Sequence, residues 1–208
     1  MIELLTADTP NGKKISIMLE EIGYKYKVTK IDINKDEQFK IEFRKLSPFS
    51  KIPVIIDKDE NKSVFESGAI LIYLGEKSNK FYEENNRIKI NQWLMAQVGL
   101  IGPLIGQHHQ FHHYNPGKSN FGEERYFKIA KRLYRDLDER LSNSKFLSGE
   151  DYTIADIATW PWIARHEWHD IGLKNFKNLT RWYLEIANRD AVVKGYDLMN
   201  NGSVIPKP

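Results

Sequence analysis

Apolar side chains change their spacing several times along the first 80 residues, and each spacing predicts a different element. A short apolar run over 1–5 indicates a strand, and the next apolar positions lie on one helical face: Ile15, Met18, Leu19 and Ile22. Further patterns predict strands at 26–33, 54–56 and 63–65, and helices at 39–46 and after 67. The order is strand, helix, strand, helix, strand, strand, helix. A right-handed crossover makes the first two strands parallel and covers the sheet with helices, which is an α/β domain.

The second half of the chain is predicted to be entirely helical. A stripe that starts at Ile90 is interrupted by glycines and a proline, which predicts a bent helix. Thr153 and Asp156 form a capping signal for a very apolar helix, and a last helix is expected near 176–188. Residues 81–87 lack periodicity. The predicted organisation is an α/β domain at 1–80, a linker at 81–87 and an all-α domain at 88–208.

Composition narrows the functional classes. The 208 residues are 41% hydrophobic and 28% charged, which is ordinary for a globular protein with one or two cores. The net charge of +3 comes from 31 basic and 28 acidic residues without a basic run, which argues against a nucleic-acid partner. No stretch approaches the ~20 apolar residues of a membrane span, and no apolar signal segment begins the chain, so we expect a cytoplasmic protein with no membrane partner. The absence of cysteine excludes disulfides, thiolate metal sites and a protein-borne sulfur nucleophile.

The segment Thr9-Pro10-Asn11-Gly12, at the start of the first predicted helix, is the first candidate site. Because the chain has no cysteine, any thiol chemistry must use the sulfur of a ligand, in its thiolate form. The Thr9 hydroxyl, the Asn11 amide and the first helical N–H groups would all donate hydrogen bonds to that thiolate and lower its pKa. The same residue types are common at helix starts, so they could serve only to begin the helix.

A second candidate site lies between residues 51 and 74. Pro53 begins a strand, where a cis peptide bond is common and would leave the neighbouring main chain free to pair with an extended ligand. Glu66 and Ser67 lie where a strand passes into a helix. The unpaired N–H groups of that helix suit a carboxylate, while Glu66 suits an ammonium. A ligand with an α-amino acid end, which carries both groups, fits this pair.

Four histidines lie close together in the second half of the chain: His108, His109, His112 and His113. Their i, i+4 spacing on a helix can hold zinc. No third ligand or acidic partner lies in register, so we predict no metal site beyond weak surface affinity. Trp160, Trp162 and Trp168 are predicted to be packing residues, and Asp156 is predicted to be a helix cap rather than a base.

The motifs Lys51-Ile52-Pro53-Val54 and Phe65-Glu66-Ser67-Gly68-Ala69-Ile70 resemble the glutathione-binding strand and the γ-glutamyl-binding turn of the cytosolic glutathione transferases. Thr9-Pro10-Asn11-Gly12 is similar to the motif of one branch, the Nu class and the bacterial disulfide-bond oxidoreductases. The resemblance extends to both ends of the chain. It implies a thioredoxin-like N-terminal domain, an all-α C-terminal domain and a homodimer with each site at the subunit boundary.

The resemblance also implies roles for individual residues. Thr9 and Asn11 would lie near the sulfur of glutathione. The rest of glutathione would contact six further residues: Gln38, Lys51, Ile52, Pro53, Glu66 and Ser67. Arg132 resembles a basic residue that helps to bind a second glutathione, so two glutathione molecules per site are expected. The histidine run resembles a stretch near the family's cleft, which suggests contact with the electrophile or the second ligand.

These residues imply a glutathione-dependent disulfide reductase, in which bound glutathione thiolate attacks a small disulfide and a second glutathione completes the exchange. Conjugation of an electrophile or reduction of a peroxide would use the same thiolate. The first loop offers only Thr6 and Thr9, with no tyrosine or serine, which favours reduction. The alternative is a catalytically silent binding or regulatory module of the same fold. The pair Phe49-Ser50 favours that alternative, because this branch usually has asparagine-rich residues there.

Overall fold

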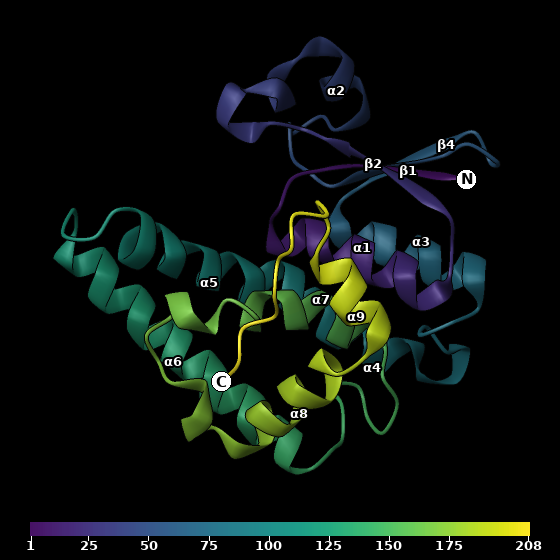
Figure 1. Cartoon of the computed structure of the whole chain (residues 1–208). Coiled ribbons are helices and arrows are strands. Elements are labelled where there is room, and N and C mark those ends of the chain that lie inside the picture. Colours follow the sequence, from purple (N-terminus) through teal and green to yellow (C-terminus); the bar gives the residue numbers. More distant parts are fainter. The chain divides into compact units, whose positions relative to one another are not determined.

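The computed structural model describes all residues, Met1–Pro208, and their packing divides them into two compact units (Figure 1). The first unit comprises Met1–Tyr82 and Arg189–Val204, and the second comprises Glu83–Asn188 and Ile205–Pro208. The sequence analysis assigned 189–204 to the helical domain, whereas the structure packs this segment in the first unit.

A four-stranded sheet in the order β2-β1-β3-β4 forms the base of the first unit. Its strands are β1 (Ile2–Thr6), β2 (Tyr26–Lys30), β3 (Val54–Asp57) and β4 (Lys62–Phe65). β1 pairs with β2 in parallel, while the pairs β1–β3 and β3–β4 are antiparallel. The predicted strands and the parallel first pair are therefore confirmed, except that the second strand ends at Lys30 and not at Ile33, and the sheet has the mixed topology of a thioredoxin-like domain.

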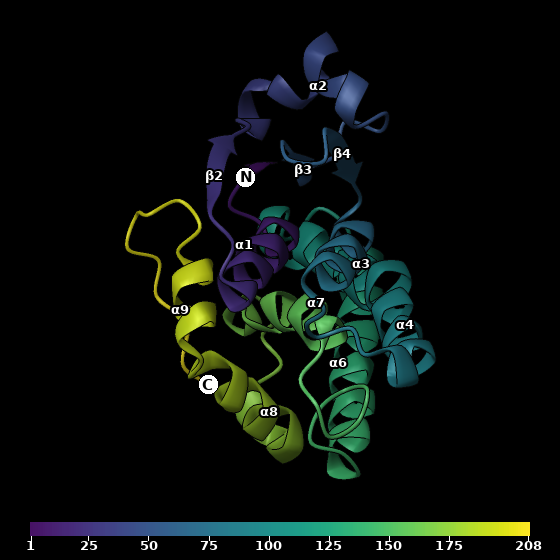
Figure 2. The same ribbon diagram turned by 90° about the vertical axis from the view of Figure 1, so that its right-hand side faces the viewer.

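Helices cover both faces of this sheet. α1 (Pro10–Ile22) and α3 (Ser67–Ser78) lie side by side on one face, and α2 (Ile41–Leu46) lies on the other (Figures 1 and 2). Two short 3₁₀ turns, η1 (Ile33–Lys35) and η2 (Glu37–Phe39), lead from β2 to α2. The core beneath α2 is apolar: Leu5, Phe43 and Val54, with Ile31, Leu46, Ile52 and Ile56 packed against them. α2 is shorter than the predicted helix at 39–46 because η2 occupies its start.

Asp57, at the end of β3, attaches the β3–β4 hairpin to α3. Its buried carboxylate accepts hydrogen bonds from the Tyr73 hydroxyl at 2.7 Å and is paired with Lys77 Nζ at 2.8 Å. Burial alone would raise the pKa of Asp57, but these bonds and those from the amides of Asp59 and Glu60 outweigh it and lower the pKa to about 2. The carboxylate is therefore charged at neutral pH and holds α3 against the sheet.

The second unit is entirely helical, as predicted (Figure 2). Its elements are η3 (Glu84–Asn86), α4 (Arg87–Ala96), η4 (Gln97–Ile101), α5 (Gly102–His108), η5 (His109–Tyr114), α6 (Asn120–Ser142), α7 (Ile154–Ile163), η6 (His166–Trp168), η7 (Leu173–Asn175) and α8 (Lys177–Ala187). The predicted bent helix is confirmed, because η4 is a π-helical segment that joins α4 to α5. At this junction Gly102 lies close to Gln97, since a Cβ there would be 2.7 Å from Gln97 Nε2 and 3.2 Å from the Gln97 carbonyl oxygen. None of the helices combines the length and the apolar character that crossing a membrane requires.

Asp156 caps α7, the most completely buried helix of the second unit, and is itself fully buried. It accepts hydrogen bonds from the amide of Leu147 at 2.9 Å, from Trp182 Nε1 at 2.9 Å and from the amide of Thr153 at 3.1 Å. The predicted capping box of Thr153 and Asp156 is therefore confirmed. Burial raises the pKa of Asp156 to about 6, although these bonds act in the opposite direction.

The C-terminal helix α9 (Asp190–Tyr196), which the sequence analysis did not predict, packs on α1 within the first unit. Ser16 Oγ donates to the carbonyl of Gly195 at 2.6 Å, and a Cβ at Gly195 would lie 2.6 Å from the Cα of Ile17. This close approach of two backbones requires glycine. It explains why 189–204 belongs to the first unit.

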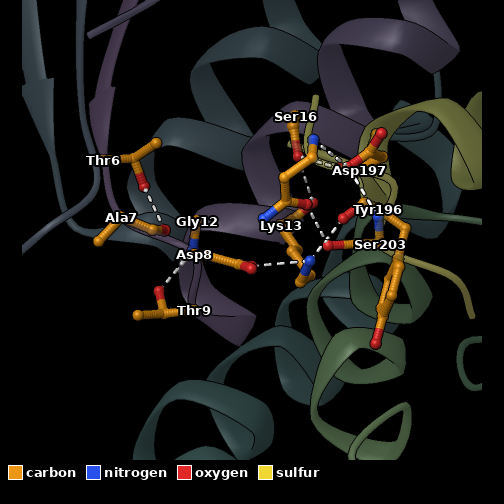
Figure 3. A network of polar contacts seen from close by, with 12 residues as sticks. Thr6, Ala7, Asp8, Thr9, Gly12, Lys13, Ser16, Tyr196, Asp197 and Ser203 are labelled. Atoms are coloured by element: carbon orange, nitrogen blue, oxygen red, sulfur yellow. Dashed lines mark hydrogen bonds and ion pairs between the residues drawn. The ribbon is translucent and has the colours of Figure 1, made fainter. Parts of the chain in front are cut away.

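Lys13 forms the second connection between α1 and α9 (Figure 3). Its buried Nζ is 2.7 Å from Asp8 Oδ1, donates to the carbonyl of Tyr196, and lies 4.0 Å from the centre of the Tyr196 ring. Asp197 follows directly and accepts hydrogen bonds from three amides of the next turn: Asn201, Gly202 and Ser203. The segment after α9 is therefore held beside the loop that precedes α1.

We predict that Asp156→Asn lowers the free energy of unfolding by about 2–4 kcal/mol, because the amide nitrogen cannot accept from the buried Thr153 donors while the single oxygen serves Leu147 and Trp182. Chemical denaturation of the purified variant measures this change. Asp151→Asn, at an exposed position nearby, is the control and should change the value by less than ~0.5 kcal/mol. Equal stabilities of the two variants would contradict the assigned role of Asp156.

We also predict that Lys13→Met costs about 1–3 kcal/mol, because it leaves the buried Tyr196 carbonyl without its donor. Asp8→Asn should cost at most ~0.5 kcal/mol, since the Asp8 side chain is 41% exposed and its ion pair is screened by water. The midpoints of urea denaturation compare the two. A cost for Asp8→Asn as large as that for Lys13→Met would show that the ion pair, and not the contact with α9, stabilises this region.

Candidate functional site

The pairing of the strands brings the predicted site segments of the first unit to one end of the sheet. Leu5 pairs with Val54, and Val54 pairs with Phe65. The end of β1, the start of β3 and the end of β4 therefore lie next to one another. The loop to Thr9, the Ile52-Pro53 dipeptide and the Glu66-Ser67 turn all leave the sheet at this end. Leu5 also pairs with Thr29 of the parallel strand β2, so the segment that carries Gln38 starts at the same end.

Thr9 is the N-cap of α1. Its Oγ1 accepts a hydrogen bond from the amide of Gly12 at 3.1 Å, so the predicted helix-starting role is confirmed. This role does not exclude the other one, because a hydroxyl that accepts one bond can still donate its own proton to a ligand. Thr9 and Asn11 are both half-buried, which leaves part of each side chain open to solvent.

Gly12 brings the β1–α1 loop close to the helix. A Cβ at this position would lie 2.5 Å from the Ala7 carbonyl oxygen and 2.5 Å from Thr6 Oγ1. Thr6 itself is fully buried and donates to the Ala7 carbonyl at 3.3 Å. Of the two threonines in the first loop, only Thr9 is therefore available to a ligand (Figure 3).

The Ile52–Pro53 peptide bond is cis, as the sequence analysis expected for this position. The sheet ladder begins at Val54, so the main chain of Ile52 lies outside it. Ser47 closes the preceding loop, because its Oγ donates to the Lys51 carbonyl at 2.8 Å and accepts from the Lys51 amide at 3.1 Å. The Lys51 side chain is exposed.

Glu66 and Ser67 form the junction of β4 and α3. Glu66 has φ 69° and its side chain makes no capping bond to α3, which leaves the exposed carboxylate available to a cation. The first hydrogen bond of the helix runs from the amide of Ile70 to the carbonyl of Glu66. The amides of Ser67, Gly68 and Ala69 precede that bond and have no acceptor within the helix, an arrangement that is chemically suited to an anion.

Gln38 lies on η2 and is half-buried. Its Nε2 donates to the carbonyl of Ile33 at 3.4 Å, while its buried Oε1 has no hydrogen-bond partner. An unpaired acceptor at this end of the sheet is suited to the N–H group of a peptide-like ligand. Arg132 lies on α6 in the second unit, where its side chain is exposed.

The predicted surface character of the histidine run is wrong for two of its four members. His108 and His109 are buried, where Nε2 of His108 lies 2.9 Å from the His169 carbonyl oxygen and Nε2 of His109 lies 2.7 Å from His169 Nε2. Burial lowers the pKa of His109 to about 3. The regular i, i+4 spacing is also lost, because 109–114 is a π-helical segment. No group of three or more His, Cys, Asp or Glu side chains in the structure is arranged to hold a metal ion.

The tryptophans differ in burial. Trp160 is fully buried and donates to the carbonyl of Tyr183 at 3.0 Å, so its predicted packing role is confirmed. Trp162 and Trp168 are only half-buried. Trp168 stacks on His113, with ring centres 4.0 Å apart. The guanidinium carbon of Arg165 lies 4.2 Å from the centre of the Trp168 ring. These two side chains form part of the surface of the second unit.

Two buried lysines on α1, Lys13 and Lys14, are not predicted by the sequence patterns. Lys14 Nζ donates to Ser67 Oγ at 3.2 Å and so connects the start of α1 to the start of α3. A signal for Lys14 was present in the sequence. It lies four residues before Met18, within the apolar stripe of α1, where an ionisable side chain is unusual.

Two family models match the chain. The glutathione S-transferase N-terminal domain matches residues 3–76, and the glutathione S-transferase C-terminal domain matches residues 118–190. The disulfide-bond oxidoreductase YfcG of Escherichia coli (strain K12) is 44% identical over 198 residues, which cover 92% of each chain.

Solved structures agree in fold. A glutathione transferase from Burkholderia graminis, crystallised with two glutathione molecules per subunit, is 36% identical, with a TM-score of 0.90 over 97% of this chain and 89% of the other. A glutathione transferase from Pseudomonas putida, with one glutathione disulfide per subunit, is 38% identical, with a TM-score of 0.87 over 95% and 91% of the chains. With both of its halves matched and these relatives covered almost end to end, the chain belongs to the glutathione transferase family of enzymes.

Proposed function

We propose that the protein binds glutathione at the end of the sheet where β1, β3 and β4 meet, and that it uses the glutathione thiolate to reduce disulfides. The observation that carries the proposal is the strand register. It brings three features to one place: the start of α1 with its hydroxyl and amide donors, the main chain of Ile52 that is not paired in the sheet, and the acidic turn at Glu66. The absence of cysteine requires that the reacting sulfur come from the ligand.

Each part of glutathione has a counterpart at this site. The γ-glutamyl carboxylate fits the first amides of α3 and the Ser67 hydroxyl, while its ammonium fits Glu66. The peptide main chain fits that of Ile52 beside Pro53, with Lys51 and Gln38 along it. The sulfur then lies toward the start of α1, where Thr9 and Asn11 donate hydrogen bonds. Each unit by which they lower the thiol pKa represents about 1.4 kcal/mol of preference for the thiolate.

The proposed reaction consumes two glutathione molecules and one disulfide. The first glutathione thiolate attacks one sulfur of the disulfide, forming a mixed disulfide and expelling the other sulfur as a thiolate, which takes up a proton. A second glutathione thiolate attacks the glutathione sulfur of the mixed disulfide, releases the second substrate thiol and forms glutathione disulfide. Two glutathione molecules are oxidised and one substrate disulfide is reduced. We assign the second glutathione to Arg132, in agreement with the family resemblance.

Three findings on relatives support this proposal. YfcG is named a disulfide-bond oxidoreductase, and the Burkholderia and Pseudomonas transferases were crystallised with two glutathione molecules or with glutathione disulfide. A cytoplasmic location follows from the proposal, because the cytosol keeps glutathione reduced. Conjugation to an electrophile, or reduction of a peroxide, would proceed from the same bound thiolate.

A specific observation favours a second candidate function, a silent binding module. Phe49 is 74% exposed and Ser50 is buried with φ 55°, in the loop directly before Lys51. In this branch, asparagine-rich residues usually occupy that loop. A silent module would bind glutathione weakly or not at all, which calorimetry distinguishes from an enzyme.

We predict that Thr9→Ala combined with Asn11→Ala lowers turnover of 2-hydroxyethyl disulfide by roughly tenfold to a hundredfold, because the thiolate loses both side-chain donors. The assay couples glutathione disulfide to glutathione reductase and NADPH. Thr9→Ser is the matched control, since it keeps both the cap to Gly12 and the hydroxyl donor, and should retain most of the activity. Unchanged turnover in the double variant would refute the assignment of the sulfur site.

We further propose a homodimer, with contacts at 66–73 and along the helix after Ile90. Light scattering should return a mass close to twice the 24.4 kDa of one chain. A homodimer is expected because the family typically places each site at the boundary of two subunits. A mass of one chain would exclude a shared site and leave the residues of a single chain to bind glutathione alone.

A further inference from the structure

Lys14 is a buried lysine that has no assigned role in the proposed reaction. Its side chain is 1% exposed, in the face of α1 that packs on α3. Lysine is rarely buried in this way, because removing an ammonium from water is costly. A hydrophobic residue of similar volume in this position would commonly make a protein more stable. The presence of Lys14 therefore calls for a functional explanation.

The contact of Lys14 with Ser67 fixes the direction of a hydrogen bond. When Lys14 is protonated, its ammonium has donors only, so Ser67 Oγ accepts from Lys14 Nζ, which is 3.2 Å away. The hydroxyl proton of Ser67 is then directed away from Lys14. Ser67 is the first residue of α3, so this proton and the first amides of the helix are available to the same ligand group. That group must be an acceptor, and the ammonium and the helix start favour one with negative charge.

The charges around Lys14 agree with this geometry. Burial lowers the pKa of Lys14 to about 7, and the negative charge of Glu66, across the β4–α3 junction, acts in the opposite direction. Lys13, the neighbouring cation on α1, is paired with Asp8, and Asp197 after α9 interacts with Lys13. Near neutral pH, Lys14 is thus close to the balance between its charged and neutral forms, and an anion beside Ser67 would favour the charged form.

We infer that Lys14 is a positioning residue for a ligand carboxylate: its ammonium orients the Ser67 hydroxyl as a donor and places a positive charge behind it. The inference rests on the proposed glutathione site and specifies how that site selects an α-amino acid end. Two consequences follow. Lys14 discriminates a carboxylate from a neutral group, and binding of the carboxylate is accompanied by uptake of a proton near and above neutral pH.

The first test compares two ligands and two proteins by titration calorimetry at about pH 6.5. The ligands are S-methylglutathione, which has no titratable thiol, and its analogue with the γ-glutamyl α-carboxylate replaced by a primary amide. Lys14→Met removes the charge and shortens the side chain by only one atom. We expect this substitution to weaken binding of S-methylglutathione about tenfold or more, and binding of the amide analogue less than about threefold. Lys25→Met, which removes one charge at an exposed position, should leave both affinities unchanged.

The outcomes separate this inference from the proposed function. If the wild-type protein does not bind S-methylglutathione, both are overturned. If it binds, but Lys14→Met weakens the two ligands equally or has no effect, only the role of Lys14 is overturned. A selective loss for the carboxylate ligand supports the inference, because damage to the fold would weaken both ligands alike.

The second test uses only the wild-type protein and so does not depend on the folding of a variant. Binding enthalpies of S-methylglutathione in buffers of different ionisation enthalpy give the number of protons taken up. With the pKa of Lys14 at about 7 in the unliganded protein, uptake should be small at about pH 6 and approach one proton at about pH 8. Affinity should fall over the same interval as the pH rises. Uptake near zero at all pH values would overturn the inference, and the amide analogue should show little uptake.

Discussion

The pairing of Leu5 with Val54, and of Val54 with Phe65, is the constraint on which the candidate site depends. A slip of one residue in either pair would turn every side chain of a strand to the other face of the sheet and separate the three loops that leave it. The register is secured from both sides, by apolar packing beneath α2 and by the charged contact of Asp57 with α3. The geometry of the site therefore depends on the pairing of the strands more than on the conformation of any single loop.

Sequence patterns predicted the parts of this arrangement that depend on local order. The strands, α1 and α3 follow from the spacing of apolar residues, and the Thr153–Asp156 cap from a motif four residues long. These predictions succeeded because the physical cause lies within a few residues of the pattern. The candidate residues Thr9, Ile52 and Glu66 were identified separately, and only the register of the strands brings them to one end of the sheet.

The features that were missed depend on partners distant in the sequence. α9 is short and lies far from α1 along the chain, and it is held by Lys13, Ser16 and the close approach at Gly195. The burial of His108 and His109 depends on His169, about 60 residues away. Lysine and histidine are ordinarily surface residues, so a pattern that reads polarity alone places them in water. Their burial was visible only once the packing of whole helices was known.

The return of residues 189–204 to the first unit has a consequence for the synthesis of the protein. Domains generally fold as units, beginning with the N-terminal one while the chain is still being made. Here the first unit cannot be finished at that stage, because the surface of α1 around Ser16 and Ile17 is covered by α9, which is synthesised only after residues 83–188 of the helical unit. The thioredoxin-like unit is thus begun before the helical residues 83–188 are made and completed after them, so these residues fold as an insertion between its two parts.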